Sequence, residues 1–253
     1  MMQRLTNAMF SPWTILVLLV VLWEVLSQTG TVSPKLLPPA SQVFVVLYEE
    51  LQRPQMHQAM MVTAYEVVVA FVIAMPLGIL LGVFLAESKY WGEVFKPVFQ
   101  FLFSIPKSIF LPMFILSIGI GVSQKIAYGV FSMIFIVVIS TSVAVKSIKG
   151  SYVIVARCYG ASRWQTFKHV YLPSMLPAML ETARLGMIFN FTGVILAEMY
   201  VSRMGVGNLI GTWGENYQLP KLMAGIVLVS VVAILFNEAV RWVEKKYGHW
   251  RTE

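Results

Sequence analysis

Long apolar runs alternate with short polar segments along the whole chain. A helix needs about 20 apolar residues to cross about 30 Å of hydrocarbon, and most of the runs reach that length. We therefore predict six transmembrane helices. The runs cover residues 13–29, 61–86, 99–119, 125–145, 178–202 and 221–242.

Two of these runs contain residues that predict how the helices pack or bend. Gly78 and Gly82 form a G-x-x-x-G step in the second run, which favours close helix contact within the chain. Pro106 and Pro112 interrupt the third run together with Lys107, and proline removes helix hydrogen bonds, so this span should be kinked or broken. Such a break lines a cavity or hinge in some transporters, and a purely structural kink explains the pattern equally well.

Composition favours a bilayer as the solvent. Of the 253 residues, 58% are hydrophobic and 12% are charged, against about 25% charged residues in an ordinary soluble domain. We expect one transmembrane domain over residues 1–253, with a core bundle at about 58–243. The net charge of +7 comes from scattered bases without an aromatic-interleaved patch, which argues against nucleic-acid binding. The single Cys158 and the few histidines give no metal-site spacing.

The basic residues predict which ends of the helices face the cytoplasm. An even number of spans puts both termini on one side, and cytoplasmic loops carry the excess of Lys and Arg. With both termini inside, 12 of the 19 bases are cytoplasmic. These are Arg4, Lys89, Lys96, Lys146, Lys149, Arg157, Arg163, Lys168, Arg241, Lys245, Lys246 and Arg251, whereas Lys35, Arg53, Lys125, Arg203 and Lys221 would lie outside. The first run contains Glu24 and lacks a small-residue cleavage site, so we expect a retained helix rather than a signal peptide.

One polar segment, VARCYGASRWQTFKHVYLP at residues 155–173, separates the fourth and fifth runs. Gly160 is a favourable helix stop, and Ser162 is a favourable N-cap for a second short helix. The residues predicted to share one face of that second helix are Trp164, Phe167, Val170 and Tyr171. A helix with such an apolar strip either docks in a groove of another protein or lies flat in the headgroup layer.

Four ionisable residues fall within or beside the apolar runs, namely Glu66, Lys107, Arg184 and Glu198. Ionisable groups at membrane depth are costly and by default indicate function. Arg184 and Glu198 lie about 21 Å apart along one helix, too far to pair, although they point in similar directions. Either both face a dimer interface or a pathway through the membrane, or each reaches the membrane surface or a structural partner.

The polar segment resembles the motif E-A-A-x3-G-x9-I-x-L-P of the membrane subunits of binding-protein-dependent ABC importers. Gly160 and the stretch Val170-x-Leu172-Pro173 match this motif without gaps. Three further stretches resemble the same family: LLPPASQVFVVLYEEL at 36–51, FSIPKSIFLPMFILSIGIG at 103–121 and ARLGMIFNFTGVILAEMYVSRMGVGNLI at 183–210. The resemblance covers nearly the whole chain. It is closest to the branch that serves nitrate, sulfonates, taurine and some pyrimidine or vitamin precursors.

This resemblance implies an all-α membrane protein with the type I ABC importer permease fold. It implies six transmembrane helices and a cytoplasmic helix-Gly-helix coupling segment at about 150–173. The residues expected to couple to an ATPase are Ala156, Gly160, Ala161, Ser162, Trp164, Phe167, Val170, Leu172 and Pro173. The residues expected along the pathway or its gate are Pro106, Pro112, Gly119, Glu66, Arg184, Glu198, Gly205 and Gly207.

Two positions depart from the family pattern. The Glu-Ala-Ala of the motif falls on Ile154, Val155 and Ala156, so only the last alanine is kept. In the second span, many relatives have Ser-Leu-x-Arg where this chain has Thr63-Ala64-Tyr65-Glu66, which reverses a charge. The contacts that relatives make with those two charged residues therefore do not transfer to this chain.

The resemblance also implies partners and an energy source. The chain has no G-x-x-x-x-G-K-[ST] phosphate loop. ATP and Mg would therefore bind to a dimer of cytoplasmic ABC ATPases, and this chain would hold no cofactor. A second permease copy or a paralogue, together with a periplasmic or extracellular solute-binding protein, would complete the importer. The expected location is the bacterial cytoplasmic (inner) membrane.

Two other classes of function are compatible with a six-span chain. Gly160-Ala161-Ser162 has the G-x-S pattern of intramembrane serine proteases, but it lies in a polar loop. The histidines are His57, His169 and His249, all expected outside the spans, so no histidine base is within reach of a serine at membrane depth. The other class is an ATP-independent channel or secondary carrier. Carriers often show internal repeats, and the two halves of this chain show none.

Overall fold

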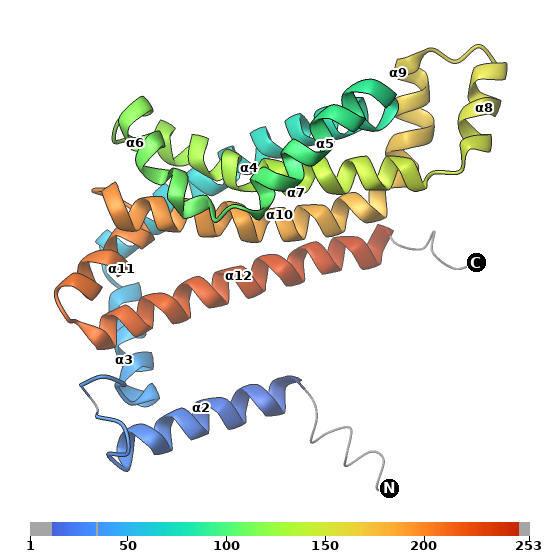
Figure 1. The fold of residues 1–253 in the computed structure, drawn as a ribbon. Coiled ribbons are helices and arrows are strands. Elements are labelled where there is room, and N and C mark those ends of the chain that lie inside the picture. Colours follow the sequence, from blue (N-terminus) through green and yellow to red (C-terminus); the bar gives the residue numbers. More distant parts are fainter. Residues whose placement is uncertain (1–11, 34, 248–253) are drawn as a thin grey trace, which may run out of the picture.

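The computed structural model describes residues 12–33 and 35–247, and within these residues the regular structure is entirely helical. The helices run from one end of the chain to the other with short connections (Figure 1). Their bounds are α2 (Pro12–Gln28), α3 (Ala40–Leu51), α4 (Pro54–Glu87), α5 (Lys89–Ser104), η1 (Lys107–Phe110), α6 (Leu111–Ile118), α7 (Val122–Ser147), α8 (Gly150–Cys158), α9 (Arg163–Thr166), η2 (Phe167–Tyr171), α10 (Leu172–Val201), α11 (Val206–Glu215) and α12 (Leu219–Tyr247).

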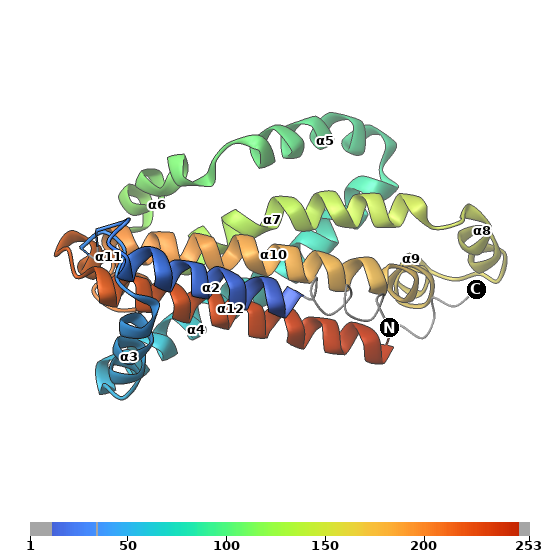
Figure 2. The same cartoon turned by 90° about the horizontal axis from the view of Figure 1, so that it is seen from below.

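The core of the molecule is the bundle of α4, α7 and α10, which lie side by side (Figures 1 and 2). Glycines allow α4 to approach α7 closely. A Cβ atom on Gly78 would lie 2.6 Å from the Cβ of Val137, and one on Gly82 would lie 2.5 Å from the Cβ of Thr141. Both distances are shorter than van der Waals contact, so only glycine fits at these positions. The G-x-x-x-G step therefore serves packing within the chain, as predicted.

The third predicted span is broken rather than continuous. α5 and the η1–α6 unit are bent by 94° relative to each other. Pro106 precedes η1, and Pro112 lies in the first turn of α6, where proline is tolerated because the N–H has no partner there. Lys107 stabilises the break, because its Nζ donates to the carbonyl oxygens of Leu102 (3.0 Å), Phe103 (2.7 Å) and Ile105 (2.9 Å).

The first helix, α2, packs little against the bundle, and most of its large apolar side chains are exposed. Polar contacts hold one end of it. Trp23 Nε1 donates to the carbonyl of Pro38 (2.9 Å), and the hydroxyl of Ser41 donates to the carboxylate of Glu24 (2.7 Å). These contacts join α2 to α3 and to the loop between them.

The structure supports four to five of the six predicted spans by length and composition. Among the described residues, α4, α7, α10 with its preceding turns, and α12 are each long and apolar enough to cross a membrane, and the bent α5–α6 pair is a fifth candidate. The apolar helix at residues 14–28 is shorter. The count of six is therefore not confirmed.

The two ends of the bundle differ in what they carry. α8 and α9 project from one end, where α2 also begins and α12 ends (Figure 1). At the opposite end lie α3, α6 and α11 (Figures 1 and 2). The bundle therefore places the two groups of predicted site residues at opposite ends.

Candidate functional site

The α8–α9 hairpin is built by local signals in the sequence. Gly160 adopts a left-handed conformation with φ of +76°, and its N–H donates to the carbonyl of Arg157 (2.9 Å). Ala161 N–H donates to the carbonyl of Ala156 (3.0 Å), which closes the end of α8. Ser162 then caps α9 reciprocally with Gln165, because each side chain accepts from the backbone N–H of the other residue. The predicted stop at Gly160 and cap at Ser162 are both confirmed.

The predicted apolar strip of the second helix does not form one exposed face. Trp164 is 66% exposed, whereas Tyr171 is 6% exposed and belongs to an apolar cluster with Met175 and Met179. Phe167 and Val170 pack against the same cluster. Contrary to the prediction of one apolar strip for docking, Tyr171 is therefore buried within this chain, and Phe167 and Val170 are half-buried.

The backbone explains this difference. Residues 167–171 form a π-helix, which turns each residue less than the 100° that the sequence pattern assumes. The helix then continues without a break through Leu172 and Pro173, so that residues 163–201 form one long helix. The second short helix is thus the first part of the fifth span.

The exposed apolar side chains of the hairpin lie mainly on α8 and the turn that follows it. They are Tyr152, Ile154, Val155, Tyr159 and Trp164. Tyr159 is 89% exposed, and Trp164 stacks on Phe167 with 5.5 Å between ring centroids. We call this set the hairpin face. Ile154 and Val155, where the motif's acidic residue and first alanine are missing, are part of it.

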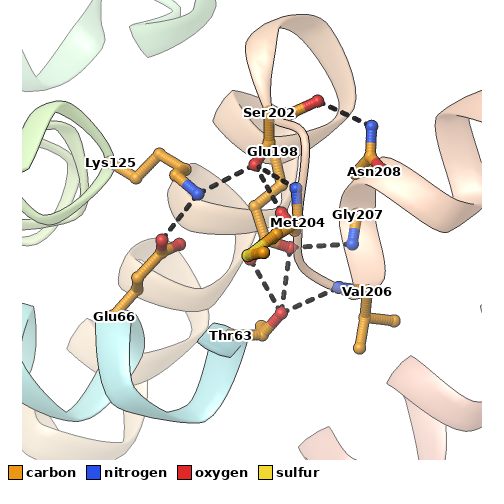
Figure 3. A network of polar contacts seen from close by, with 9 residues as sticks. All are labelled: Thr63, Glu66, Lys125, Glu198, Ser202, Met204, Val206, Gly207 and Asn208. Atoms are coloured by element: carbon orange, nitrogen blue, oxygen red, sulfur yellow. Dashed lines mark hydrogen bonds and ion pairs between the residues drawn. The ribbon is translucent and has the colours of Figure 1, made fainter. Parts of the chain in front are cut away.

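A second group of predicted site residues meets at the opposite end of the bundle, around a buried ion pair. Lys125 Nζ of α7 lies 2.6 Å from Oε1 of Glu66 on α4 (Figure 3). Glu66 is fully buried and Lys125 is 4% exposed. The same Nζ donates to the hydroxyl of Ser202 at 2.8 Å, just after the end of α10. One ammonium group therefore connects α4, α7 and the exit of α10.

Glu198 forms the other half of this polar network. The hydroxyl of Thr63 donates to the carboxylate of Glu198 (2.7 Å to Oε1) and accepts from the N–H of Val206 (2.9 Å). The N–H of Gly207 donates to Oε2 of Glu198 at 2.7 Å (Figure 3). The fully buried Glu198 thus binds the first turn of α11 and joins it to α4 and α10.

Two glycines make this arrangement possible. Gly205 has φ of +107°, a conformation that side chains disfavour. On Gly207, a Cβ would lie 2.5 Å from the carbonyl oxygen of Ile195 and 2.6 Å from the Cβ of Glu198. α11 can therefore approach α10 only with glycine at 207.

The remaining pathway candidates lie apart from the polar network. Pro106 and Pro112 flank the bend between α5 and α6. Gly119 ends α6 with φ of +88°. Arg184 is half-buried on α10 and makes no hydrogen bond or ion pair with any described residue. The prediction that Arg184 and Glu198 do not pair is confirmed.

Sequence reasoning missed two members of the network. Lys125 was counted only among the basic residues on the outer side, but it lies in the first turn of α7 and is buried. The signal was its position, because it lies only four residues after Gly121 at the start of a long apolar run. A further signal was Glu66, because a buried carboxylate needs a counter-charge. The second missed member is Thr63, which lies one turn before Glu66 and donates its hydroxyl to Glu198.

A model of one protein family matches residues 52–249, which include both groups of site residues. That family is described as the binding-protein-dependent transport system inner membrane component. This chain belongs to that family. It is therefore a transport permease subunit of the ABC importer class and not an enzyme.

Curated relatives extend over nearly the whole chain. The putative aliphatic sulfonates transport permease protein SsuC of Bacillus subtilis (strain 168) is 28% identical over 233 residues, which are 92% of this chain and 84% of the relative. The taurine transport system permease protein TauC of Escherichia coli (strain K12) is 27% identical over 246 residues, which are 95% of this chain and 89% of TauC. Both belong to the branch that the sequence motifs indicate.

A solved structure shows the same fold. A chain of the bacterial ABC transporter involved in the import of the acidic polysaccharide alginate superposes with a TM-score of 0.65 at 16% identity. The match covers 96% of this chain and 99% of that one. The type I importer permease fold is therefore shown.

Membership in this permease family also removes the protease alternative. The hydroxyl of Ser162 acts as a helix cap, since it accepts from Gln165 N–H at 3.2 Å. Nδ1 of His169 lies 3.0 Å from the carbonyl oxygen of Gln165, so this histidine is held by the helix backbone. The G-x-S pattern thus serves local structure.

Proposed function

We propose that this chain forms the membrane pathway of an ATP-driven importer for a small solute and couples to its ATPase through the α8–α9 hairpin, residues 150–173. The observation that carries the proposal is the hairpin face. It exposes five large apolar side chains on a segment that projects beyond the bundle. Such a surface favours burial in a groove of another protein.

The hairpin end of the molecule faces the cytoplasm in this proposal, and both termini lie on the same side. Two features support it. α2 begins and α12 ends at the hairpin end of the bundle (Figure 1). The polar segments at that end also carry the excess of basic residues, as cytoplasmic loops of bacterial membrane proteins do.

The importer contains a pair of ABC ATPases, two permease subunits and a solute-binding protein. ATP and Mg bind to the ATPases, which close around them and move the two hairpins. Because η2 and α10 continue the hairpin as one helix, this movement reaches the Glu198 network at the other end, and the bundle opens outward toward the loaded binding protein. The whole chain acts as one transmembrane domain with its core at about 58–243.

The names of the relatives support a substrate class. SsuC and TauC are named for aliphatic sulfonates and taurine, so we propose a small organic solute of that kind. Nitrate and pyrimidine or vitamin precursors are the other candidates within the same branch. Mass spectrometry of the ligand that co-purifies with the binding protein identifies which of them is transported.

Pull-down of the ATPase tests the coupling role. Trp164→Asp places a charge on the hairpin face, and we expect the chain to remain in the membrane and lose the ATPase. Leu36→Asp is the matched control, because Leu36 is 70% exposed and lies outside the hairpin. Gly160→Pro, which cannot adopt φ of +76°, should also lose the ATPase. Retention of the ATPase by both hairpin variants would show that the docking face lies elsewhere.

Uptake of labelled substrate tests the energy source. Replacing the catalytic carboxylate of the partner ATPase should abolish uptake in membranes that still contain this chain. Uptake that survives this change would identify an ATP-independent carrier or channel instead.

A further inference from the structure

A cavity of about 350 Å³ lies between the hairpin and the junction of α4 with α5. Glu87 and Ser88 line it from that junction. Arg157 lines it from α8, and Arg163 and Thr166 line it from α9. The cavity therefore lies where the second span ends and the hairpin begins.

The lining of this cavity is positively charged. It contains two guanidinium groups, Arg157 and Arg163, and one carboxylate, Glu87, so its net formal charge is +1. Within the described part of the chain, neither guanidinium lies within ion-pair distance of a carboxylate. Both groups keep their hydrogen-bond donors free for an anion.

The start of α5 borders the cavity through its N-cap residue, Ser88. Ser88 caps this 16-residue helix by accepting from the N–H of Trp91 at 3.3 Å. The N–H groups of a first helical turn have no acceptor within the helix, and the helix dipole there favours an anion. The cavity thus combines two planar guanidinium groups with the positive end of a helix dipole beside Ser88, which suits the tetrahedral oxygens of a phosphate group.

The side chains beside the cavity indicate the depth at which it lies. Tyr90, Trp91 and Phe95 form a row of ring contacts, with centroids 5.1 Å and 5.5 Å apart, and all three are exposed. Aromatic rings of this kind gather at the level of the lipid headgroups. Phe84, which lines the cavity on the side of α4, is 52% exposed and offers an apolar surface for an acyl chain.

We propose that this cavity binds the phosphate group of an anionic phospholipid headgroup, with Arg157 and Arg163 as its principal ligands. Basic pockets beside transmembrane helices on the cytoplasmic side are suited to such headgroups. The bound lipid would connect the hairpin to the end of α4. This proposal takes the orientation of the chain from the proposed function, but lipid binding can be measured on the chain alone.

Native mass spectrometry of the purified full chain tests the proposal. The chain is released from micelles that contain equal amounts of phosphatidylglycerol and phosphatidylcholine, and the retained lipid is identified. Wild type should prefer phosphatidylglycerol by about thirtyfold, since each of the two arginines contributes about 1 kcal/mol to binding of an anionic lipid near a membrane surface. The double variant Arg157→Gln/Arg163→Gln should lose this preference.

The matched control removes the same charge from the same segment outside the cavity. Lys149 and Lys168 are exposed and do not line it, so Lys149→Gln/Lys168→Gln should keep the preference. If both double variants lose it equally, the attraction is a general surface effect and the proposal is wrong.

Two further measurements distinguish other anions. Inorganic phosphate added to the chain in pure phosphatidylcholine nanodiscs should raise the unfolding temperature less than phosphatidylglycerol does. An equal, arginine-dependent rise would assign the cavity to free phosphate.

The assembled complex should also retain phosphatidylglycerol. The lipid proposal fails if the complex retains no phosphatidylglycerol and the double variant Arg157→Gln/Arg163→Gln releases the ATPase. In that case the cavity receives an acidic side chain of the ATPase. Loss of lipid preference with the ATPase retained would leave the coupling role of the hairpin intact.

Discussion

Glu66 and Lys125 form an ion pair of 2.6 Å between α4 and α7, with side chains that are 0% and 5% exposed. The two oxygens of Glu66 make no directed hydrogen bond, so the compensation of this buried carboxylate rests on the charge of Lys125. Two buried charges of this kind are stable only as a pair.

Replacing Lys125 by methionine should destabilise the chain strongly. The variant leaves the Glu66 charge buried without compensation, which costs about 3–5 kcal/mol. Thermal unfolding in detergent micelles measures the loss. Lys96→Met is the control, because Lys96 is exposed on α5, and it should unfold at the wild-type temperature. The double variant Glu66→Leu/Lys125→Met should recover most of the stability, and failure to recover would mean that the ion pair is not the reason for the loss.

Two tyrosines of the hairpin segment, one in the turn after α8 and one in η2, should respond differently to substitution by alanine. Tyr171 is 6% exposed and packs in the bundle, whereas Tyr159 is 89% exposed. Tyr171→Ala should lower the stability by about 3–5 kcal/mol, as aromatic truncations in a core do. Tyr159→Ala should leave the unfolding temperature unchanged and weaken retention of the ATPase in a pull-down. Equal unfolding temperatures for the two variants would contradict the packing of Tyr171.

Much of the fold could be predicted from the sequence because the signals are local. The apolar runs, the stop at Gly160 and the cap at Ser162 each depend on a few neighbouring residues. The break near Pro106 and Pro112 is local too, since proline removes its own hydrogen bond. These features appear in the structure near their predicted positions.

The parts that could not be predicted depend on residues far apart or on a change of helical period. The pairing of Lys125 was not predicted because nothing near it in the sequence indicates Glu66, which approaches it only when α4 packs on α7. The exposure of Phe167 and Tyr171 was misjudged because a regular period was assumed through the π-helix at residues 167–171. Pairing in three dimensions and irregular turns are invisible to a periodicity argument.

The contact of α11 with α10 should tolerate no side chain at Gly207. A Cβ there would lie 2.5 Å from the carbonyl oxygen of Ile195, so Gly207→Ala should cost about 1–3 kcal/mol through overpacking and disturb the Glu198 network. Gly214→Ala on the same helix is the matched control, because the nearest atom to its Cβ would lie 3.9 Å away on Leu222. Differential scanning fluorimetry of the two variants compares them, and a stable Gly207→Ala would contradict the close approach.

Lys107 should hold the end of α5 in place at the bend. Its ammonium donates to three carbonyl oxygens that the helix end leaves without partners, and it lies 5.2 Å from the ring centroid of Phe103. Lys107→Met keeps the apolar stem and removes these donors. Since a hydrogen bond to a charged group contributes about 1.5–3 kcal/mol, local opening of this helix end should become at least about tenfold more frequent.

Hydrogen–deuterium exchange of the full chain measures this opening. Exchange should accelerate at residues 102–110 in Lys107→Met and stay unchanged in the middle of α7, which provides the internal reference. Lys107→Arg should restore slow exchange, because the guanidinium can donate to the same carbonyl oxygens. Exchange at the bend that remains as slow in Lys107→Met as in wild type would show that the two prolines alone fix the geometry of the break.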